Sequence, residues 1–250
     1  MKQLMRYKLT IEYDGTNLLG WQRQLDGPSA QQYLEEVLEI LSGHHSEVAA
    51  AGRTDAGVHA LGQVAHIDFE TSMEPWKIRE AFNANLRQKN APVRVINVEQ
   101  VSADFHARFS AVGRGYIYRI LNRRAPSVLA ENRVWWVPVP LNIKQMRAGA
   151  KYLLGYHDFT SFRASACQAK SPLKTLDKLD IKKQGDEILF DVEARSFLHH
   201  QVRNMVGTLK MVGEGKLSPE DIKKILDAKD RTKAGMTAPA CGLYLNKVMY

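Results

Sequence analysis

The sequence predicts an α+β protein made of two mixed subdomains, with mostly antiparallel sheets and helices on one face, flanking a central cleft. Three observations support this class. Strand and helix patterns occur in both halves without a regular βαβ rhythm. The order strand, helix, strand recurs in each half, and no Gly/Ser-rich or Pro-rich linker separates them. At 250 residues, the chain is long enough to bury a substantial core in each half.

The first subdomain is expected over residues 1–108. Residues 6–13 alternate between apolar and polar side chains, which indicates a strand. A helix is expected over 29–42, because Ser29 and Gln32 form a capping-box pattern and Gly43 is a typical helix end. Further strands are expected at residues 46–51, 63–69 and 93–99, and a further helix from Pro75.

The second subdomain is expected over residues 109–250. Residues 176–183 and 187–194 form a predicted hairpin around Gly185, followed by a long helix over 196–212. Ser218 caps a short helix whose first residue is a proline. Further strands are expected at residues 116–121 and 243–250, and a further helix at 143–153 closed by Gly155.

The charge of the chain favours a polyanionic partner. The formal net charge is +8, and nearly all of the excess lies in residues 126–250, with 20 basic and 13 acidic side chains against 15 and 14 in residues 1–125. A basic surface attracts nucleic acid, the commonest polyanion in the cytoplasm. Ordinary solubility charge is the alternative, since no run of five or six like charges marks a basic arm.

Several classes of protein are disfavoured. No apolar stretch approaches the roughly 20 residues that span a bilayer, and the first eight residues lack the apolar core of a signal peptide. Two cysteines, Cys167 and Cys241, are too few for a disulfide framework. We therefore expect a cytoplasmic protein without a membrane partner.

Neither a metal nor a nucleotide cofactor is indicated. The Gly-rich phosphate-binding patterns of nucleotide sites are absent from the sequence. The pairs His44-His45 and His199-His200 do not have the spacing of a metal-binding helix, since adjacent helical side chains point about 100° apart. We therefore expect no cofactor and no metal.

The strongest candidate site is the loop between two predicted strands, which reads AGRTDAGVHA over residues 51–60. Gly52 and Gly57 permit positive-φ backbone or close approach, so this loop can present the Asp55 carboxylate at the end of a sheet. The alternative is a tight turn in which Asp55 bonds its own backbone, which is common for Asp next to Gly.

The whole set of motifs resembles the tRNA pseudouridine synthase A (TruA) family, nearly from end to end. The most specific block is GRTDAGVH at residues 52–59. The other matching blocks, in chain order, are EYDG at 12–15, GWQRQ at 20–24, NANL at 83–86, DFHARFS at 104–110, RGYIY at 114–118, DFTSFR at 158–163, FLHHQVRN at 197–204 and GLYL at 242–245.

The resemblance implies a pseudouridine synthase fold with an active-site cleft, and an isomerase that needs no cofactor. In that reaction the N-glycosidic bond of uridine breaks and a C–C bond forms through C5. Asp55 is implied as the essential carboxylate, and three routes stay open: attack on the sugar C1′, addition to C6 of uracil, or abstraction of a sugar proton. A partly dry cleft disfavours an ionised carboxylate, so a nearby cation is needed, and the resemblance suggests Arg203.

The resemblance also implies further site residues, each with a plainer alternative. Tyr116 is expected to contact the uracil, unless it is a core tyrosine of its strand. Leu243 is expected on the other side of the base, and core packing explains it equally well. Arg53 fills the place of the flipped base or binds a phosphate, unless it forms a simple salt bridge. For Arg203, the alternative is an arginine on a solvated helix face.

The implied substrate is the tRNA anticodon stem-loop, with uridines at tRNA positions 38, 39 and 40, and the family members are homodimers. Stem uridines must be extruded before they react, at a cost that phosphate contacts and stacking offset. Possible phosphate contacts are Arg23, Arg108, Arg114 and Arg163. Two rivals remain: a non-catalytic RNA-binding protein of the translation apparatus, and a nucleosidase that pairs Asp55 with Glu12 or Asp14.

Overall fold

The computed structural model describes residues 3–250, which form two compact units. Unit 1 comprises the described residues through Val112 together with Tyr244–Tyr250, and unit 2 comprises Gly113–Leu243. The subdomain boundary drawn from the sequence lies between residues 108 and 109. In the structure the first unit extends to Val112 and also takes up the last strand of the chain.

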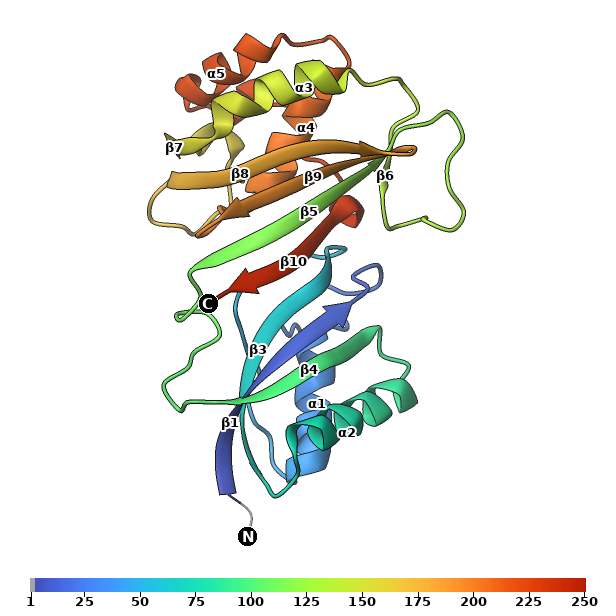
Figure 1. Ribbon diagram of the computed structural model, residues 1–250, viewed down its shortest axis with the longest axis vertical. Helices are drawn as coiled ribbons and strands as arrows, with labels where there is room; N and C mark the ends of the chain where they lie inside the picture. Colours follow the sequence, from blue (N-terminus) through green and yellow to red (C-terminus); the bar gives the residue numbers. More distant parts are fainter. Residues whose placement is uncertain (1–2) are drawn as a thin grey trace. The chain divides into compact units, whose positions relative to one another are not determined.

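Unit 1 is a mixed sheet with two helices on one face (Figure 1). Its strand order is β4 (Val93–Val101), β1 (Gln3–Tyr13), β3 (His59–Thr71) and β10 (Leu243–Met249). The short strand β2 (Ala49–Ala50) pairs with β3. β1 is antiparallel to both of its neighbours, whereas β10 runs parallel to β3.

The core of unit 1 lies between this sheet and the helices α1 (Ala30–Ser42) and α2 (Pro75–Gln88). The fully buried side chains of α1 recur at helical spacing, and those of β1 recur at every second residue. Ser29 caps α1 by accepting a hydrogen bond from the Gln32 N–H, and Gly43 ends it with φ +82°. The Gln32 side chain bonds Glu36, so only half of the expected capping box forms.

Unit 2 has a second sheet, in the order β5 (Gly113–Leu121), β9 (Glu187–Ala194), β8 (Leu173–Gln184) and β7 (Gly155–Asp158). These strands are antiparallel, and the short strand β6 (Trp135–Trp136) pairs with β5 in parallel. The helices α3 (Ile143–Ala150), α4 (Gln201–Gly213) and α5 (Pro219–Ala228) cover one face (Figure 1). Both units confirm the predicted α+β class with mostly antiparallel sheets.

Two features of unit 2 differ from the sequence-based prediction. The helix expected from residue 196 begins only at Gln201, because His200 adopts the left-handed conformation with φ +61°. The helix expected over 143–153 is α-helical to Ala150 and continues as a short 3₁₀ turn, Lys151–Leu153. Among residues 3–250, no helix combines the length and the apolar character needed to cross a bilayer.

Candidate active site

The loop that carries Asp55, residues 51–58, joins β2 to β3 and is fixed by hydrogen bonds along its length. The Ala51 N–H donates to the Val64 carbonyl at 2.7 Å, and the Gln63 side-chain amide donates to the Gly52 carbonyl at 2.9 Å. At the middle of the loop, the buried hydroxyls of Tyr13 and Thr54 are 2.8 Å apart. The residue just before Asp55 is thereby tied to β1.

A second segment, residues 15–21, supports the Asp55 loop from its other side. The Trp21 N–H donates to the Thr54 carbonyl at 3.1 Å, and the Gly57 N–H donates to the Leu18 carbonyl at 3.3 Å. Gly20 has φ +91°, and a Cβ added there would lie 2.3 Å from the Thr54 carbonyl oxygen. Only glycine permits this close approach of two backbones.

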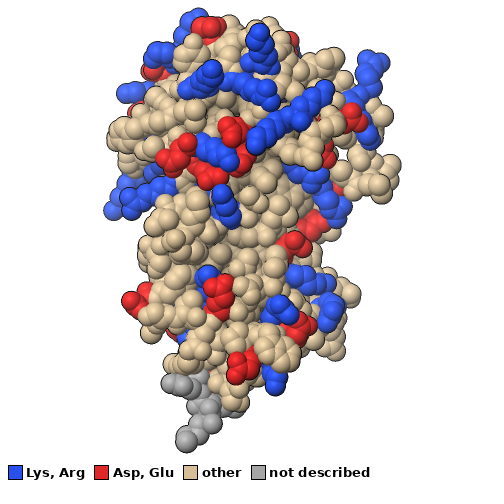
Figure 2. All heavy atoms as spheres, viewed as in Figure 1, with Lys and Arg blue, Asp and Glu red and all other residues tan. Residues whose placement is uncertain are grey.

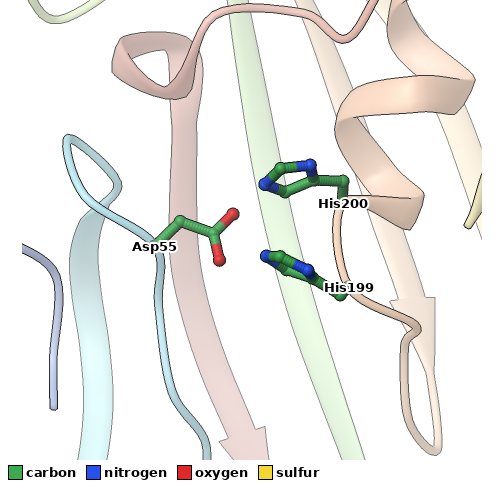
Figure 3. Close-up of side chains that lie close together, drawn as sticks. All are labelled: Asp55, His199 and His200. Carbon is green, nitrogen blue, oxygen red and sulfur yellow. The ribbon is translucent and has the colours of Figure 1, made fainter. Parts of the chain in front are cut away.

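Asp55 itself is half-buried, and its side chain projects away from the loop that carries it (Figure 3). The Asp55 carbonyl accepts the Val58 N–H at 3.1 Å, and Gly57 in this turn has φ +78°. A tight turn with a main-chain hydrogen bond across it therefore forms at residues 55–58. Gly57 meets the expectation for a positive-φ glycine, whereas Gly52 does not, and a Cβ at Gly52 would meet no atom within 4 Å.

His59 follows the loop as the first residue of β3 and is almost fully buried. Its ring stacks on Tyr244 of β10, with centroids 4.7 Å apart and planes tilted by 21°. The His59 Nδ1 accepts the Gly15 N–H at 3.0 Å and lies 3.2 Å from an Asp14 carboxylate oxygen. The His59 Nδ1 therefore faces both a backbone N–H and a carboxylate of the turn that follows β1.

The two carboxylates considered as partners of Asp55 in a nucleosidase have other surroundings. Asp14 uses one carboxylate oxygen to accept both the N–H and the hydroxyl of Thr16, at 3.0 and 2.5 Å. This arrangement shapes the turn after β1. Glu12 is exposed on the same strand.

The arginines of unit 1 predicted to act at the site differ in their surroundings. Arg53 is exposed, two residues before Asp55. Arg23 donates from its guanidinium to the buried carboxylate of Glu35 at 3.2 Å, so part of its donor capacity is used within the protein. Arg108 is exposed, with its guanidinium carbon 5.8 Å from the centroid of the Phe109 ring.

In unit 2, Arg203 lies in the first turn of α4 and is half-buried. Its Nε donates to the Ala238 carbonyl at 2.7 Å, and the Ala238 N–H donates to the Arg203 carbonyl at 3.1 Å. The side chain and the backbone of Arg203 therefore hold the same residue of the segment before β10. The alternative of an arginine on a fully solvated helix face does not describe this environment.

A buried polar network holds that segment against α4. The Asn204 side-chain oxygen accepts hydrogen bonds from the Arg231 guanidinium at 3.1 Å and the Thr237 hydroxyl at 2.7 Å. Gly207 allows the close packing, since a Cβ there would lie 1.8 Å from the Met236 carbonyl oxygen. The orientation of Arg203 thus depends on residues that the sequence patterns did not single out.

His199 and His200 precede α4 rather than lying on it, which corrects the argument that they point about 100° apart on a helix. The positive φ of His200 breaks the helical geometry, and the two ring centroids lie 4.0 Å apart (Figure 3). A non-glycine residue in this conformation is strained. By themselves, two imidazoles offer half of the four ligands that zinc usually takes.

The remaining predicted residues of unit 2 have defined contacts within that unit. Tyr116 on β5 is half-buried, and its ring meets Phe197 edge-on, with centroids 5.2 Å apart. Leu243 is 6% exposed, so packing accounts for much of its environment. The guanidinium of Arg114 donates to the Arg195 carbonyl at 3.0 Å, and that of Arg163 donates to the Cys167 carbonyl at 2.6 Å.

A second tyrosine of β5, Tyr118, is fully buried and contacts the segment that leads into β10. Burial raises the pKa of the Tyr118 phenol far above its ordinary value, so it stays protonated and donates to the Pro239 carbonyl at 2.7 Å. Burial also raises the pKa of the Cys241 thiol. Both groups are therefore neutral around pH 7, and the Tyr118 hydrogen bond holds the segment that contacts Arg203.

The residues that shape the Asp55 loop were missed as functional residues by the sequence analysis, although their signal was present. Tyr13, Gly15 and Gly20 lie in the blocks EYDG and GWQRQ, which were recognised only as part of a resemblance. A glycine in each block permits close backbone packing. The sequence does not show which segment those glycines approach.

Comparison with known proteins agrees with this fold. Residues 9–110 and 150–250 match the model of a family described as tRNA pseudouridine synthase. An α+β fold with this match over most of its length defines a uridine-isomerising enzyme. The chain belongs to the tRNA pseudouridine synthase family, which confirms the resemblance and the isomerase class predicted from the sequence.

Several relatives carry the name tRNA pseudouridine synthase A. The protein of Paramagnetospirillum magneticum is 60% identical over 98% of this chain and 95% of its own length. That of Rhodospirillum centenum is 53% identical, and that of Bartonella tribocorum is 51% identical, each over 99% of this chain and the whole of the relative. The likeness therefore extends over both units.

Proposed function

We propose that the protein converts uridine to pseudouridine at positions 38, 39 and 40 of the tRNA anticodon stem-loop, with Asp55 as the essential carboxylate. The observation that carries the proposal is the Asp55 loop. Its backbone is hydrogen-bonded on both sides, while the carboxylate projects from it and is only half-buried. A rigid loop that presents one acidic side chain suits a group that must meet a substrate in a fixed geometry.

The reaction is balanced without a cofactor. The bond between N1 of uracil and the sugar C1′ breaks, the base turns, and a bond forms between C5 and C1′. The proton on C5 then leaves, and N1 gains a proton. Asp55 starts this sequence by attacking C1′, by adding to C6, or by abstracting a sugar proton, and each route needs the ionised carboxylate.

Residues of both units are proposed to assist. Arg203 is a permanent cation suited to keep a carboxylate ionised, and its hydrogen bonds with Ala238 fix its orientation. Tyr116 and Leu243 are proposed to contact the uracil, and Arg53 to bind a phosphate or fill the gap left by the flipped base. Arg23, Arg108, Arg114 and Arg163 are proposed as phosphate contacts. The protein is further proposed to act as a homodimer in the cytoplasm.

Tritium release from tRNA labelled at uracil C5 tests the proposal. The wild type is expected to release tritium, Asp55→Asn to release none above background while still binding tRNA, and Arg203→Leu to lose turnover far more than affinity. Arg203→Lys is the control that retains the charge. Unchanged release by Asp55→Asn would refute the assignment of the carboxylate. A wild type that binds tRNA and never releases tritium would indicate the RNA-binding alternative, and free uracil a nucleosidase.

A further inference from the structure

A loop of unit 1 other than the Asp55 loop presents an aromatic ring to solvent. Phe109, in the segment of residues 102–110, is 77% exposed. Arg108 beside it is also exposed, and its guanidinium lies over the ring at a distance typical of a cation–π contact. A single exposed apolar side chain is common on protein surfaces. Phe109 differs from such side chains because its loop is held in a fixed conformation.

The turn that carries Phe109 is closed by side-chain hydrogen bonds. The His106 Nδ1 accepts the backbone N–H groups of Arg108 and Phe109, at 3.1 and 3.4 Å. The Ser110 hydroxyl accepts the His106 N–H at 2.9 Å, and the Ser110 N–H returns a bond to the His106 carbonyl at 2.9 Å. Residues 106–110 are therefore a preformed turn rather than a loose loop.

The same turn is fastened to the sheet through Ala107, which is fully buried. Its N–H donates to the Nδ1 of His66 on β3 at 3.3 Å, and its carbonyl accepts the Tyr250 hydroxyl at 2.8 Å. The rings of His66, His106 and Phe109 follow one another, with centroids 4.7 and 4.4 Å apart. The rings of this column are tilted against one another, by 59° and 39°, and Phe109 is its most exposed member.

We propose that Phe109, with Arg108, is a stacking platform for an unpaired nucleobase of the tRNA substrate. This inference rests on the proposed function for the identity of the RNA. Unstacked bases of single-stranded RNA are bound by aromatic rings, and arginine binds the adjoining phosphate. Extrusion of a stem nucleotide costs the RNA stacking free energy. A preformed aromatic ring offsets part of that cost, because the ring loses little conformational freedom on binding.

The test is tRNA binding and turnover by variants of Phe109. Phe109→Leu keeps an apolar side chain but removes the stacking face, and it is expected to raise the Kd and KM for tRNA roughly tenfold. The kcat at saturating tRNA should stay within about twofold, and Phe109→Trp should restore the affinity. Trp76→Leu is the matched control, since Trp76 is 58% exposed with Lys77 over its ring but lies on α2 outside this column. It is expected to change neither constant.

A second measurement distinguishes stacking from other uses of the ring. The added indole in Phe109→Trp should be quenched by tRNA, and far less by a fully paired RNA duplex. Wild-type affinity in Phe109→Leu, or equal losses in Phe109→Leu and Trp76→Leu, would overturn the proposal. A Phe109→Leu variant that loses self-association in sedimentation but keeps its tRNA affinity would also overturn the proposal, because Phe109 would then contact a second copy of the chain. Tritium release by the wild type, measured in the same preparations, reports on the proposed function separately from these outcomes.

Discussion

At the scale of single residues, two buried histidine rings accept backbone hydrogen bonds that hold loops in place. His59 accepts from Gly15 beside the Asp55 loop, and His66 accepts from Ala107 beneath Phe109. Each ring is buried and in contact with another ring. In both places one imidazole nitrogen receives a buried backbone N–H, so each ring helps to hold a loop against the sheet.

This use of His66 predicts a pH dependence of stability. Burial, with the nearby Arg6 and His106, lowers the pKa of His66 from its ordinary 6.5, while Asp68 and the Ala49 backbone oppose the shift. The unfolded chain therefore binds a proton at pH values where the native ring does not. The stabilising contribution is complete above about pH 6.5 and declines as the pH falls from there toward the lowered native value.

The measurement is the free energy of unfolding, obtained by denaturant titration between pH 5 and pH 8. His66→Gln retains an acceptor and a donor but cannot titrate, so its stability should fall less steeply below about pH 6.5 than that of the wild type. Parallel curves for the two proteins would show that His66 does not contribute to the pH dependence.

At the scale of elements, strand and helix positions follow from local pattern, and their exact limits follow from tertiary contacts. The hairpin of β8 and β9, the N-terminus of α5 and the C-terminus of α1 all lie where turn and capping residues predict them. The start of α4 does not, because Leu198 is buried like the apolar residues of the helix and continues its pattern past His200. Periodicity does not reveal the positive φ of His200, after which the helix begins.

The candidate site was likewise predictable only in part. The motif GRTDAGVH indicates which carboxylate is presented, since its glycines and short polar residues are typical of a loop. The supports of that loop are non-local. Tyr13 and Thr54 are separated by 41 positions, and only the register of β1 against β3 brings them together.

The segment of residues 15–21 is predicted to determine the geometry of the Asp55 loop. Gly20→Ala places a Cβ 2.3 Å from the Thr54 carbonyl oxygen, in addition to a positive-φ strain of roughly 1–2 kcal/mol. The loop must shift, and a displacement near 1 Å typically lowers turnover about 100-fold. Turnover is measured by tritium release, and the free energy of unfolding by denaturant titration.

Gly43→Ala is the matched control for this prediction. Gly43 has φ +82°, and an added Cβ would meet nothing within 4 Å. It should lose a similar amount of stability through strain and keep full activity. Equal activity of the two alanine variants would mean that the close approach at Gly20 does not control the loop.

At the scale of the whole molecule, the charge is divided unequally between the units. Unit 2 contains 23 Lys and Arg against 13 Asp and Glu, whereas unit 1 contains 12 against 14. Lys and Arg side chains cover much of unit 2 on the face drawn in Figure 2, with acidic side chains among them. Some of these charges are neutralised locally, as in the contacts of Lys178 with Asp191 and Glu193.

The sequence indicated the sign of this asymmetry but not its full extent. Dividing the chain after residue 125 leaves residues 113–125 in the first half, whereas these residues, with four arginines and no acidic side chain, belong to unit 2. Lys247 moves in the opposite direction, because β10 pairs in parallel with β3 of unit 1. Strand partners that are distant in sequence are chosen by packing, and single-sequence patterns do not record that choice. The basic excess therefore belongs to a unit that begins at Gly113 and ends at Leu243, the first residue of β10.

This charge predicts that tRNA affinity falls as salt rises. Cationic side chains on phosphates release condensed counterions, so a plot of log K against log salt concentration should be linear with a negative slope. Each phosphate contact contributes about 0.7–0.9 to that slope, and Arg163→Gln should reduce its magnitude by about this amount.

Arg123→Gln is the control, because Arg123 already contacts Asp186 at 3.3 Å and bonds backbone carbonyls. Titrations of tRNA into Asp55→Asn give the slope without turnover, and a slope near zero would mean that affinity comes from stacking and shape rather than from the basic surface of unit 2.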